Sequence, residues 1–420
     1  MDAHRGSTPG HPTPAADLFA GPPARAPVDT GDDDAALLRL VLAGGAAAPR
    51  RSLLEACGGA AAAVRSGRDT WRAAGLDAPQ CQALAQGDAG IEAAFAAWRA
   101  RPGHGVVGWH DPAYPPLLRA TPSPPLALFI DGDVAALWRP AVAVVGSRAA
   151  TSAGRDSAGE FARAFAQAGL CVASGLASGI DAAAHLGALE AGDGGGPTVA
   201  ILGCGPDIAY PRGNAALMAR IAASGGAVAS EHPPGTGPQT AFFPSRNRII
   251  AGLALGTLVV EAHARSGALI TARQAAEAGR EVFALPGSIR NPAARGCHRL
   301  IRDGALLVET PGEVIEVLAP ELIRAAAKLR AALGAGHGAE AAAGPDPGKP
   351  PGTGAPACAY SDADSGDHHR LWQALGHDPI PMDTLVARTG LTPAGLASML
   401  VVMELEGRVA VEHGRYSRRR

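Results

Sequence analysis

The chain has 420 residues, a length that suits about three domains of roughly 150 residues each. Its residues are 47% hydrophobic and 4% aromatic, and 37 basic residues against 39 acidic ones give a formal net charge of -2, so no overall positive charge indicates a nucleic-acid partner. The cysteines form no CxxC pair and no spacing typical of zinc, and no run of about 18 apolar residues occurs, so we expect a cytoplasmic protein without a metal site or a membrane span.

The first 103 residues consist of two segments that differ in composition. Residues 1–33 are rich in Pro, Gly and Asp and have no repeating apolar pattern, which predicts a disordered leader. Residues 34–103 contain apolar stretches with helical spacing, such as AALLRLVL and GIEAAFAAWRA, broken by glycine turns. We therefore predict a small helical domain of the SAM-like kind.

A different pattern follows in the middle of the chain. Residues 106–133 alternate apolar runs with proline bends, as an extended lead-in to a sheet does. Short apolar runs then alternate with helix-compatible stretches, at 141–145, 170–173, 198–202, 227–230, 257–261, 281–284 and 305–308. Because parallel strands need crossovers and are buried on both faces, residues 104–325 are predicted to form an α/β domain with a Rossmann-like, doubly wound parallel sheet. Its ligand crevice should lie at the carboxyl ends of the strands.

The end of the chain predicts a linker and a further module. Residues 326–366 are a Gly/Pro/Ala-rich stretch, which is typical of a disordered linker. Residues 367–420 contain three helical patterns followed by a hairpin pattern, the outline of a winged helix. The would-be recognition helix, 393–406, has no Lys or Arg, which favours protein contact over DNA contact. Arg408 and Arg415 leave a wing contact with DNA open.

Two loops after predicted strands could bind an anion. The first strand ends in GSR, residues 146–148, just before a helix whose N-terminus offers unpaired N–H groups. The second strand leads into SGLASGID, residues 174–181, which again precedes a helix. Each loop alone is as compatible with a tight turn as with phosphate binding. Asp181 and His185 are interpreted as an acid at a helix N-terminus and a hydrogen-bonded histidine, in preference to a metal pair.

The run FFPSRNRIIAG, residues 242–252, combines polar and apolar residues at the start of a predicted helix. Helical spacing places Ile249 and Ile250 toward the core and leaves Arg246 and Asn247 facing the crevice. The run thus predicts that Arg246 holds a phosphate.

Aromatic and polar neighbours extend this prediction. Phe242 and Phe243 suit either the core or stacking on an unpaired base, and Arg248 receives no role. A fifth polar loop reaches the same crevice with Glu261, Ser266, Gly267, Thr271 and Arg273.

Motifs of catalysis and of cofactor binding are missing. The sequence has no Ser-His-Asp order, GxSxG, HExxH or P-loop, and GCGPDIAYP, residues 203–211, lacks the third glycine of a dinucleotide fingerprint. The crevice is therefore predicted to bind phosphate without a cofactor and without turnover.

The motifs of the sheet domain resemble those of the DNA-processing protein A (DprA/Smf) family. They are, in family order, GSR, SGLASGID, GCGPDIAYP, SEHPP, FPSRNRIIAG, VVEA, SGALITA and REVFALPG, between residues 146 and 287. The lead-in and the winged helix also resemble the family. The resemblance implies a homodimer, not an enzyme, that binds single-stranded DNA without sequence specificity. It also implies contact with single-strand binding protein and delivery of RecA recombinase during competence, natural transformation and DNA recombination.

The resemblance also implies a set of DNA-binding residues. They are Gly146, Ser147, Arg148, Ser174, Gly175, Phe243, Arg246 and Asn247. Residues that could extend the pocket are Ser178, Gly179, Ser266, Gly267 and Thr271. The chain has His298 where the family usually has asparagine, so His298 receives no role.

Two alternatives belong to other functional classes. A nucleotide-binding, phosphoribohydrolase-like enzyme of the same fold would use a PGGxGTxxE motif, of which this chain has Gly256, Thr257 and Glu261 but not the preceding PGG. A structural adaptor would work through the helical and winged-helix modules and would leave the arginine and glycine loops without a purpose.

Overall fold

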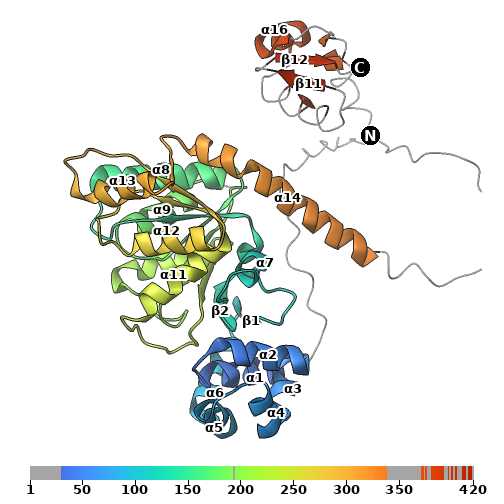
Figure 1. Cartoon of the computed structure of the whole chain (residues 1–420), viewed down its shortest axis with the longest axis vertical. Helices are drawn as coiled ribbons and strands as arrows, with labels where there is room; N and C mark the ends of the chain where they lie inside the picture. Colours follow the sequence, from blue (N-terminus) through green and yellow to red (C-terminus); the bar gives the residue numbers. More distant parts are fainter. Residues whose placement is uncertain are drawn as a thin grey trace, which may run out of the picture. The chain divides into compact units, whose positions relative to one another are not determined.

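The computed structural model describes two parts of the chain (Figure 1). It describes residues 30–337 apart from 193, and, within the C-terminal module, residues 370–372, 374–375, 380–391, 396, 399–400, 403, 409–412 and 415–418. The chain divides into two compact units, residues 1–342 and 343–420. Most of the predicted leader and linker lies outside the described residues. Helix α14, Pro311–His337, continues beyond residue 325, where we expected the linker to begin.

The N-terminal helices form one apolar cluster. They are α1 (Thr30–Leu42), α2 (Ala47–Cys57), α3 (Ala60–Arg65), α4 (Arg68–Ala73), α5 (Ala78–Gln86) and α6 (Ala89–Arg99). Asp77 and Gln80 form a capping box that fixes the start of α5. Phe95 and Trp98 of α6 are buried, and the rings of Phe95 and Phe129 of β2 form a T-shaped contact with centroids 5.9 Å apart. The helical domain therefore shares its core with the sheet.

The sheet has nine strands in the order β1-β2-β6-β5-β4-β3-β7-β8-β9. The strands are β1 (His104–Gly108), β2 (Ala127–Gly132), β3 (Ala141–Val145), β4 (Cys171–Ser174), β5 (Thr198–Leu202), β6 (Ala227–Ser230), β7 (Ala254–Val259), β8 (Glu281–Ala284) and β9 (Leu306–Leu307). From β6 to β9 all neighbours are parallel, which confirms the predicted parallel sheet. The lead-in forms β1 and β2, an antiparallel pair joined to β6.

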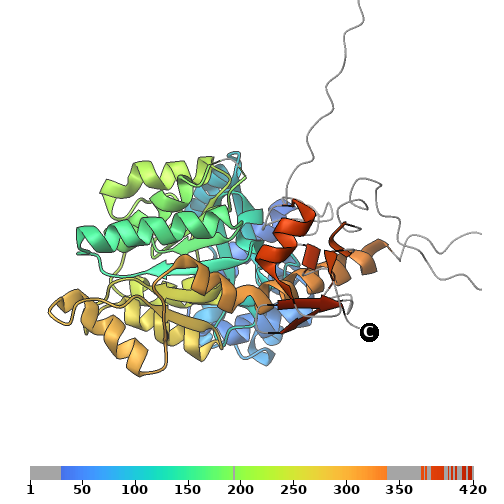
Figure 2. The ribbon, with the colours of Figure 1, turned by 90° about the horizontal axis from the view of Figure 1, so that it is seen from above.

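Helices cover both faces of the sheet (Figure 2). They include α7 (Pro116–Arg119), α8 (Ser152–Gln167), α9 (Ile180–Leu189), α10 (Ala215–Ala223), α11 (Phe242–Leu253), α12 (Ala268–Glu277) and α13 (Arg295–Arg302). Side chains of β3 alternate between two cores: Val145 packs in one cluster with Ile249 and Ile250 of α11, and Val144 in another with Phe161 of α8. The predicted core role of the two isoleucines is confirmed.

The described part of the C-terminal unit contains a three-stranded sheet and helix α16. Strand β10 (Ile380–Pro381) leads into α16 (Met382–Thr389), and β11 (Val409–Glu412) pairs antiparallel with β12 (Arg415–Arg418). These elements fit the predicted winged helix; much of the would-be recognition helix lies outside the described residues. Arg418 donates a hydrogen bond to the carbonyl of Trp372 and lies 4.5 Å from its ring centroid. Its guanidinium thus packs on its own module.

No helix in the described ranges combines the length and the apolar character that crossing a membrane requires.

Candidate functional site

A pocket of about 250 Å³ lies at the carboxyl end of the sheet, where the chain leaves β3 and enters α11 and α12. This is the crevice that the strand pattern predicted. Nine of the predicted residues line it: Gly146, Ser147, Arg148, Phe243, Arg246, Asn247, Ser266, Gly267 and Thr271. Ser174, Gly175, Ser178 and Gly179 do not line it.

The two loops that follow β3 and β4 are packed on each other. The carbonyl of Ser147 accepts the N–H of Ile180 at 3.2 Å. A Cβ added to Gly179, whose φ is +84°, would lie 2.3 Å from that same carbonyl oxygen. Only glycine allows this approach. Gly179 therefore shapes the pocket by letting the second loop lie against the first.

The N-terminus of α8 is already occupied by a carboxylate of the protein. Glu261, which is 7% exposed, accepts the N–H of Thr151 at 2.9 Å and the Thr151 hydroxyl at 2.6 Å. The Thr151 hydroxyl oxygen in turn accepts the N–H of Gly154 at 3.0 Å. Two N–H groups at this helix start, those of Thr151 and Gly154, are thus satisfied by side-chain oxygens of the protein itself. The sequence left this loop open between a tight turn and phosphate binding.

Arg246 lies inside the protein. It is 5% exposed, and its Nη1 donates to the carbonyl of Gly175 at 2.5 Å and to the carbonyl of Ile201. Its Nε donates to the Oδ1 of Asn247 at 3.1 Å. The guanidinium thus joins the ends of β4 and β5. Arg246 lines the pocket, as the sequence predicted, but its guanidinium is buried and bonded to backbone carbonyls. That it binds a phosphate stays a prediction.

A buried carboxylate accompanies the buried guanidinium. Asp181 is 6% exposed and accepts the N–H groups of Gly175 at 3.2 Å and Ala177 at 3.4 Å. Burial lowers the pKa of Arg246 and raises the pKa of Asp181, and the charge of each partner opposes the shift of the other. The pair keeps a cation beneath the pocket that is partly balanced by an internal acid.

Ser174 and Gly175, which the family resemblance placed at the DNA, serve the interior. Ser174 is fully buried, and its hydroxyl donates to the carbonyl of Val144 at 2.6 Å. A Cβ on Gly175 would lie 2.2 Å from the Nη2 of Arg246. Gly175 is therefore needed for the approach of this guanidinium, and the structure brings neither residue to the pocket.

His185 forms a buried chain of hydrogen bonds. The Thr198 hydroxyl donates to the carbonyl of Val172 at 2.7 Å, so it accepts the Nδ1–H of His185, also at 2.7 Å. His185 is fully buried, and burial lowers its pKa from 6.5 to about 3. These bonds confirm that His185 and Asp181 are internal hydrogen-bonding groups.

This histidine is expected to make stability depend on pH. Because His185 stays neutral in the fold, its contribution is present above pH 6.5 and is lost as pH falls toward 3, when the unfolded chain takes up the proton. Between pH 7 and pH 5.5 the loss should be about 1.3 kcal/mol. The measurement is chemical denaturation of wild type and His185→Gln. From pH 7 to pH 5.5 the difference between their free energies of unfolding should narrow by about 1.3 kcal/mol, because other titrating groups such as Asp181 are common to both proteins. If the free energies of unfolding of the two proteins change in parallel with pH, His185 is not the cause.

Arg148 and Phe243 stand together at the rim of the pocket. Arg148 is exposed, and its guanidinium carbon lies 5.6 Å from the ring centroid of Phe243. Phe243 is half-buried and lies at the beginning of α11. A cation and an aromatic face at one rim suit a phosphate and an adjacent unpaired base.

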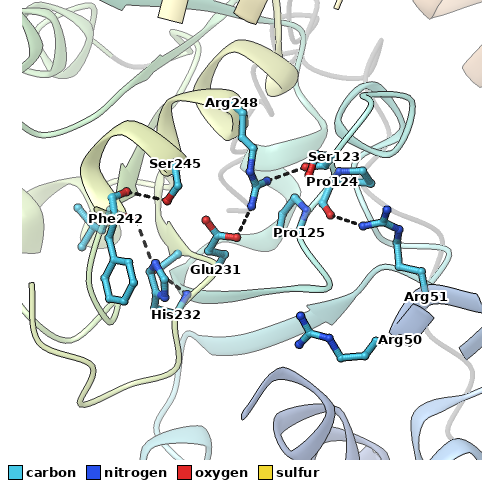
Figure 3. A network of polar contacts seen from close by, with 12 residues as sticks. Arg50, Arg51, Ser123, Pro124, Pro125, Glu231, His232, Phe242, Ser245 and Arg248 are labelled. Atoms are coloured by element: carbon cyan, nitrogen blue, oxygen red, sulfur yellow. Dashed lines mark hydrogen bonds and ion pairs between the residues drawn. The ribbon is translucent and has the colours of Figure 1, made fainter. Parts of the chain in front are cut away.

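Polar contacts join α11 to the lead-in, and the lead-in to the helical domain (Figure 3). Arg248, which the sequence left without a role, forms an ion pair with Glu231 and donates to the carbonyl of Ser123 at 2.8 Å. Arg51 of α2 donates to the neighbouring carbonyl of Pro124 at 2.9 Å. The helix that carries Phe243 is therefore fixed from the side opposite its pocket residues.

The pocket also contains residues that sequence reasoning missed. His263 lies in its wall, two residues after Glu261, together with Ala177, Pro244, Ile250, Ala268 and Ile270. The position of His263 in a loop after a strand was a signal for it. His298, by contrast, bonds the carbonyl of Gly287 through Nε2 at 2.9 Å and does not line the pocket.

A second pocket, of about 610 Å³, lies beside the first and shares Ser266 and Ile270 with it. Its lining includes Glu281 and Asp303 and four arginines: Arg265, Arg273, Arg280 and Arg299. The surface next to the first pocket is therefore richer in positive than in negative charge.

The chain resembles known proteins across most of its length. Residues 105–319 match the family model described as DNA recombination-mediator protein A, and residues 355–415 match the DprA winged helix domain. Protein Smf of Escherichia coli K12 is 38% identical over 327 residues, which cover 77% of this chain and 79% of that protein. DNA processing protein DprA of Streptococcus pneumoniae is 45% identical over 205 residues, 49% of this chain and 71% of that one. An X-ray structure of the S. pneumoniae protein has a TM-score of 0.58 and 36% identity, and covers 66% of this chain and 95% of that chain.

Proposed function

Since the chain belongs to the DNA recombination-mediator protein A (DprA/Smf) family, we propose that its sheet domain binds single-stranded DNA without sequence specificity. The protein has a DNA-processing role and is not an enzyme. The observation that carries the proposal is the exposed guanidinium of Arg148 beside the ring of Phe243, at the rim of a pocket of about 250 Å³.

Each kind of side chain has a part in the proposed complex. Arg148 binds a phosphate, because a guanidinium offers a fork of donors to phosphate oxygens. Ser147, Asn247 and Thr271 line the pocket and supply hydrogen-bonding groups to the same nucleotide. The positive charge of the buried Arg246 guanidinium favours an anion in the pocket, although the guanidinium itself is buried. Arginines of the neighbouring pocket add attraction at longer range.

Single strands should be preferred to duplex. A duplex keeps its bases stacked and paired, so their faces are not available to the rim of the pocket. Contacts to phosphates and to the faces of bases tolerate any sequence, because every base has a π-face. The proposed site therefore lacks the means of reading a sequence.

The finer parts of the proposal rest on the family. A recombination mediator must pass DNA to a recombinase, so we propose that a cytoplasmic homodimer loads RecA and contacts single-strand binding protein, in natural transformation and recombination. The winged-helix module is proposed to contact protein, because residues 393–406 have no Lys or Arg. We propose the domain limits that the sequence indicated: 34–103, 104–325 and 367–420. Helix α14 extends past the second of these domains, to His337.

The phosphoribohydrolase-like alternative would need the acid of its motif to be available. Glu261, the acidic residue that its motif would share, is bonded to Thr151 at the start of α8 and is 7% exposed. An acid committed to a helix N-terminus is not available to a substrate. The adaptor alternative gives no reason for the cation and ring at the pocket rim.

The proposal is tested by titrating the full chain against labelled oligothymidylate and a duplex of mixed sequence over a salt series. We expect the single strand to bind at least about tenfold more tightly, and the logarithm of affinity to fall by about 0.7 per neutralised phosphate for each unit of log salt. Release of free base or sugar is measured in parallel. Equal affinity for both DNAs, or release of base, would contradict the proposal.

A further inference from the structure

An exposed tyrosine continues the aromatic surface beyond the pocket. Tyr210, in the loop after β5, is 42% exposed, and its ring centroid lies 5.0 Å from that of Phe243 with the ring planes 33° apart. Of the exposed large apolar side chains in the described part of the chain, Tyr210 is the aromatic one. Because one side of the Tyr210 ring packs on Phe243, its exposed side faces solvent next to the rim of the pocket.

The spacing of these groups decides where a base can lie. Stacked aromatic planes are separated by about 3.4 Å, the rise between neighbouring base pairs in DNA, so a base between two rings needs about twice that distance. The rings of Tyr210 and Phe243 are too close for this. Since the guanidinium of Arg148 also lies over Phe243, a base beside the pocket meets the free face of Tyr210.

Hydrogen bonds hold the loop that presents Tyr210. The N–H of Gly205 donates to the carbonyl of Thr236 at 2.8 Å, and the N–H of Gly235 donates to the Oδ1 of Asp207 at 2.9 Å. After the loop, the Nδ2 of Asn214 donates to the carbonyl of Leu176 at 2.8 Å. A ring fixed in advance loses little conformational entropy when a base stacks on it.

Leu176 links this loop to the pocket. It is fully buried and has a φ of +58°, in the left-handed region that non-glycine residues rarely adopt. Its carbonyl is the acceptor for Asn214, and its loop is the one that packs on Ser147. The tyrosine loop and the phosphate pocket are thus two parts of one rigid surface.

We infer that Tyr210 is a base-stacking residue of this site, and that a single strand held at Arg148 continues over Tyr210 with an unpaired base on the tyrosine ring. The inference rests on the proposed function and extends its site from one nucleotide to two. The strand then runs from the ends of β3 and β7, across β4, toward the end of β5. No sequence preference follows, because the contact is with the face of the base.

The test combines a protein substitution with a DNA lesion. Full-length wild type, Tyr210→Ala, Tyr210→Phe and Tyr210→Leu are titrated with short oligothymidylates, intact or with one abasic site placed at each position in turn. Tyr210→Ala should bind intact DNA about 5- to 30-fold more weakly, Tyr210→Phe like wild type, and Tyr210→Leu nearly as weakly as Tyr210→Ala. With the abasic site at one particular position, wild type and Tyr210→Ala should bind equally.

The controls separate this inference from the proposed function. Leu186→Ala removes another exposed apolar side chain, on α9, and should leave DNA affinity unchanged. Thermal unfolding checks that the Tyr210 variants stay folded. If Tyr210→Ala binds every oligonucleotide as wild type does, or weakens binding equally at every abasic position, the tyrosine is no stacking residue. If wild type still binds the intact single strand, the proposed function stands and only the role of Tyr210 is refuted. If wild type binds no single strand, both the proposed function and the role of Tyr210 are refuted.

Discussion

Arg246→Met is expected to lower the free energy of unfolding by about 3–5 kcal/mol. The substitution removes the donors that serve the carbonyls of Gly175 and Ile201, and it leaves the buried carboxylate of Asp181 without its counter-charge. Unsatisfied carbonyls and an unpaired internal charge each cost free energy that the apolar side chain does not return. Chemical denaturation of the full chain, followed by circular dichroism, measures the effect.

A double-mutant cycle identifies the source of that loss. Asp181→Asn in the Arg246→Met background should restore about 1–3 kcal/mol, since the unpaired carboxylate is gone. Arg273→Met, an exposed arginine on α12, should change stability by no more than about 0.5 kcal/mol. If Arg246→Met is as stable as wild type and has lost only its DNA affinity, Arg246 is the direct phosphate ligand that the sequence predicted.

Arg148→Ala is expected to weaken binding of single-stranded DNA by about 10- to 100-fold, with no change in the melting temperature of the protein. The guanidinium is exposed at the pocket rim, so it contributes little to the fold. A charged hydrogen bond to a phosphate is worth about 1.5–3 kcal/mol. The slope of log affinity against log salt should become shallower by about 0.7, the value for one phosphate of a single strand.

A neighbouring arginine provides the matched control. Arg155 is also exposed, on α8, and donates to the carbonyl of Ala150 without lining the pocket. Arg155→Ala should keep the affinity within about twofold of wild type. Equal losses in the two variants would mean that only the general charge of this surface matters, and an unchanged affinity in Arg148→Ala would remove the proposed phosphate contact.

The sheet was predictable because its signals are local. A buried parallel strand is a short apolar run, and each run between β3 and β9 contains enough of its strand to be recognised. The same holds for Ile249 and Ile250, whose spacing along α11 already places them in the core. The position of the pocket followed as well, since parallel strands bring the loops after their carboxyl ends together.

The partners of individual polar side chains could not be predicted from the local sequence. Arg246 turns inward because of two carbonyls that lie 71 and 45 residues earlier in the chain, at the ends of other strands. Glu261 reaches Thr151, 110 residues away, and so accepts a backbone N–H at the start of α8. A pattern within one segment carries no information about which backbone groups of another segment remain without partners.

The shared core of the helical domain and the sheet bears on how this protein can be shortened. Phe129 and Val106 of the antiparallel edge are buried in the same cluster as Phe95 and Trp98 of α6. A fragment that begins at β1 would leave one face of that edge uncovered, with its apolar side chains in water. Such a fragment needs polar residues in place of the apolar ones that β1 and β2 would expose. Otherwise the N-terminal helices should be kept, because they cover this end of the sheet.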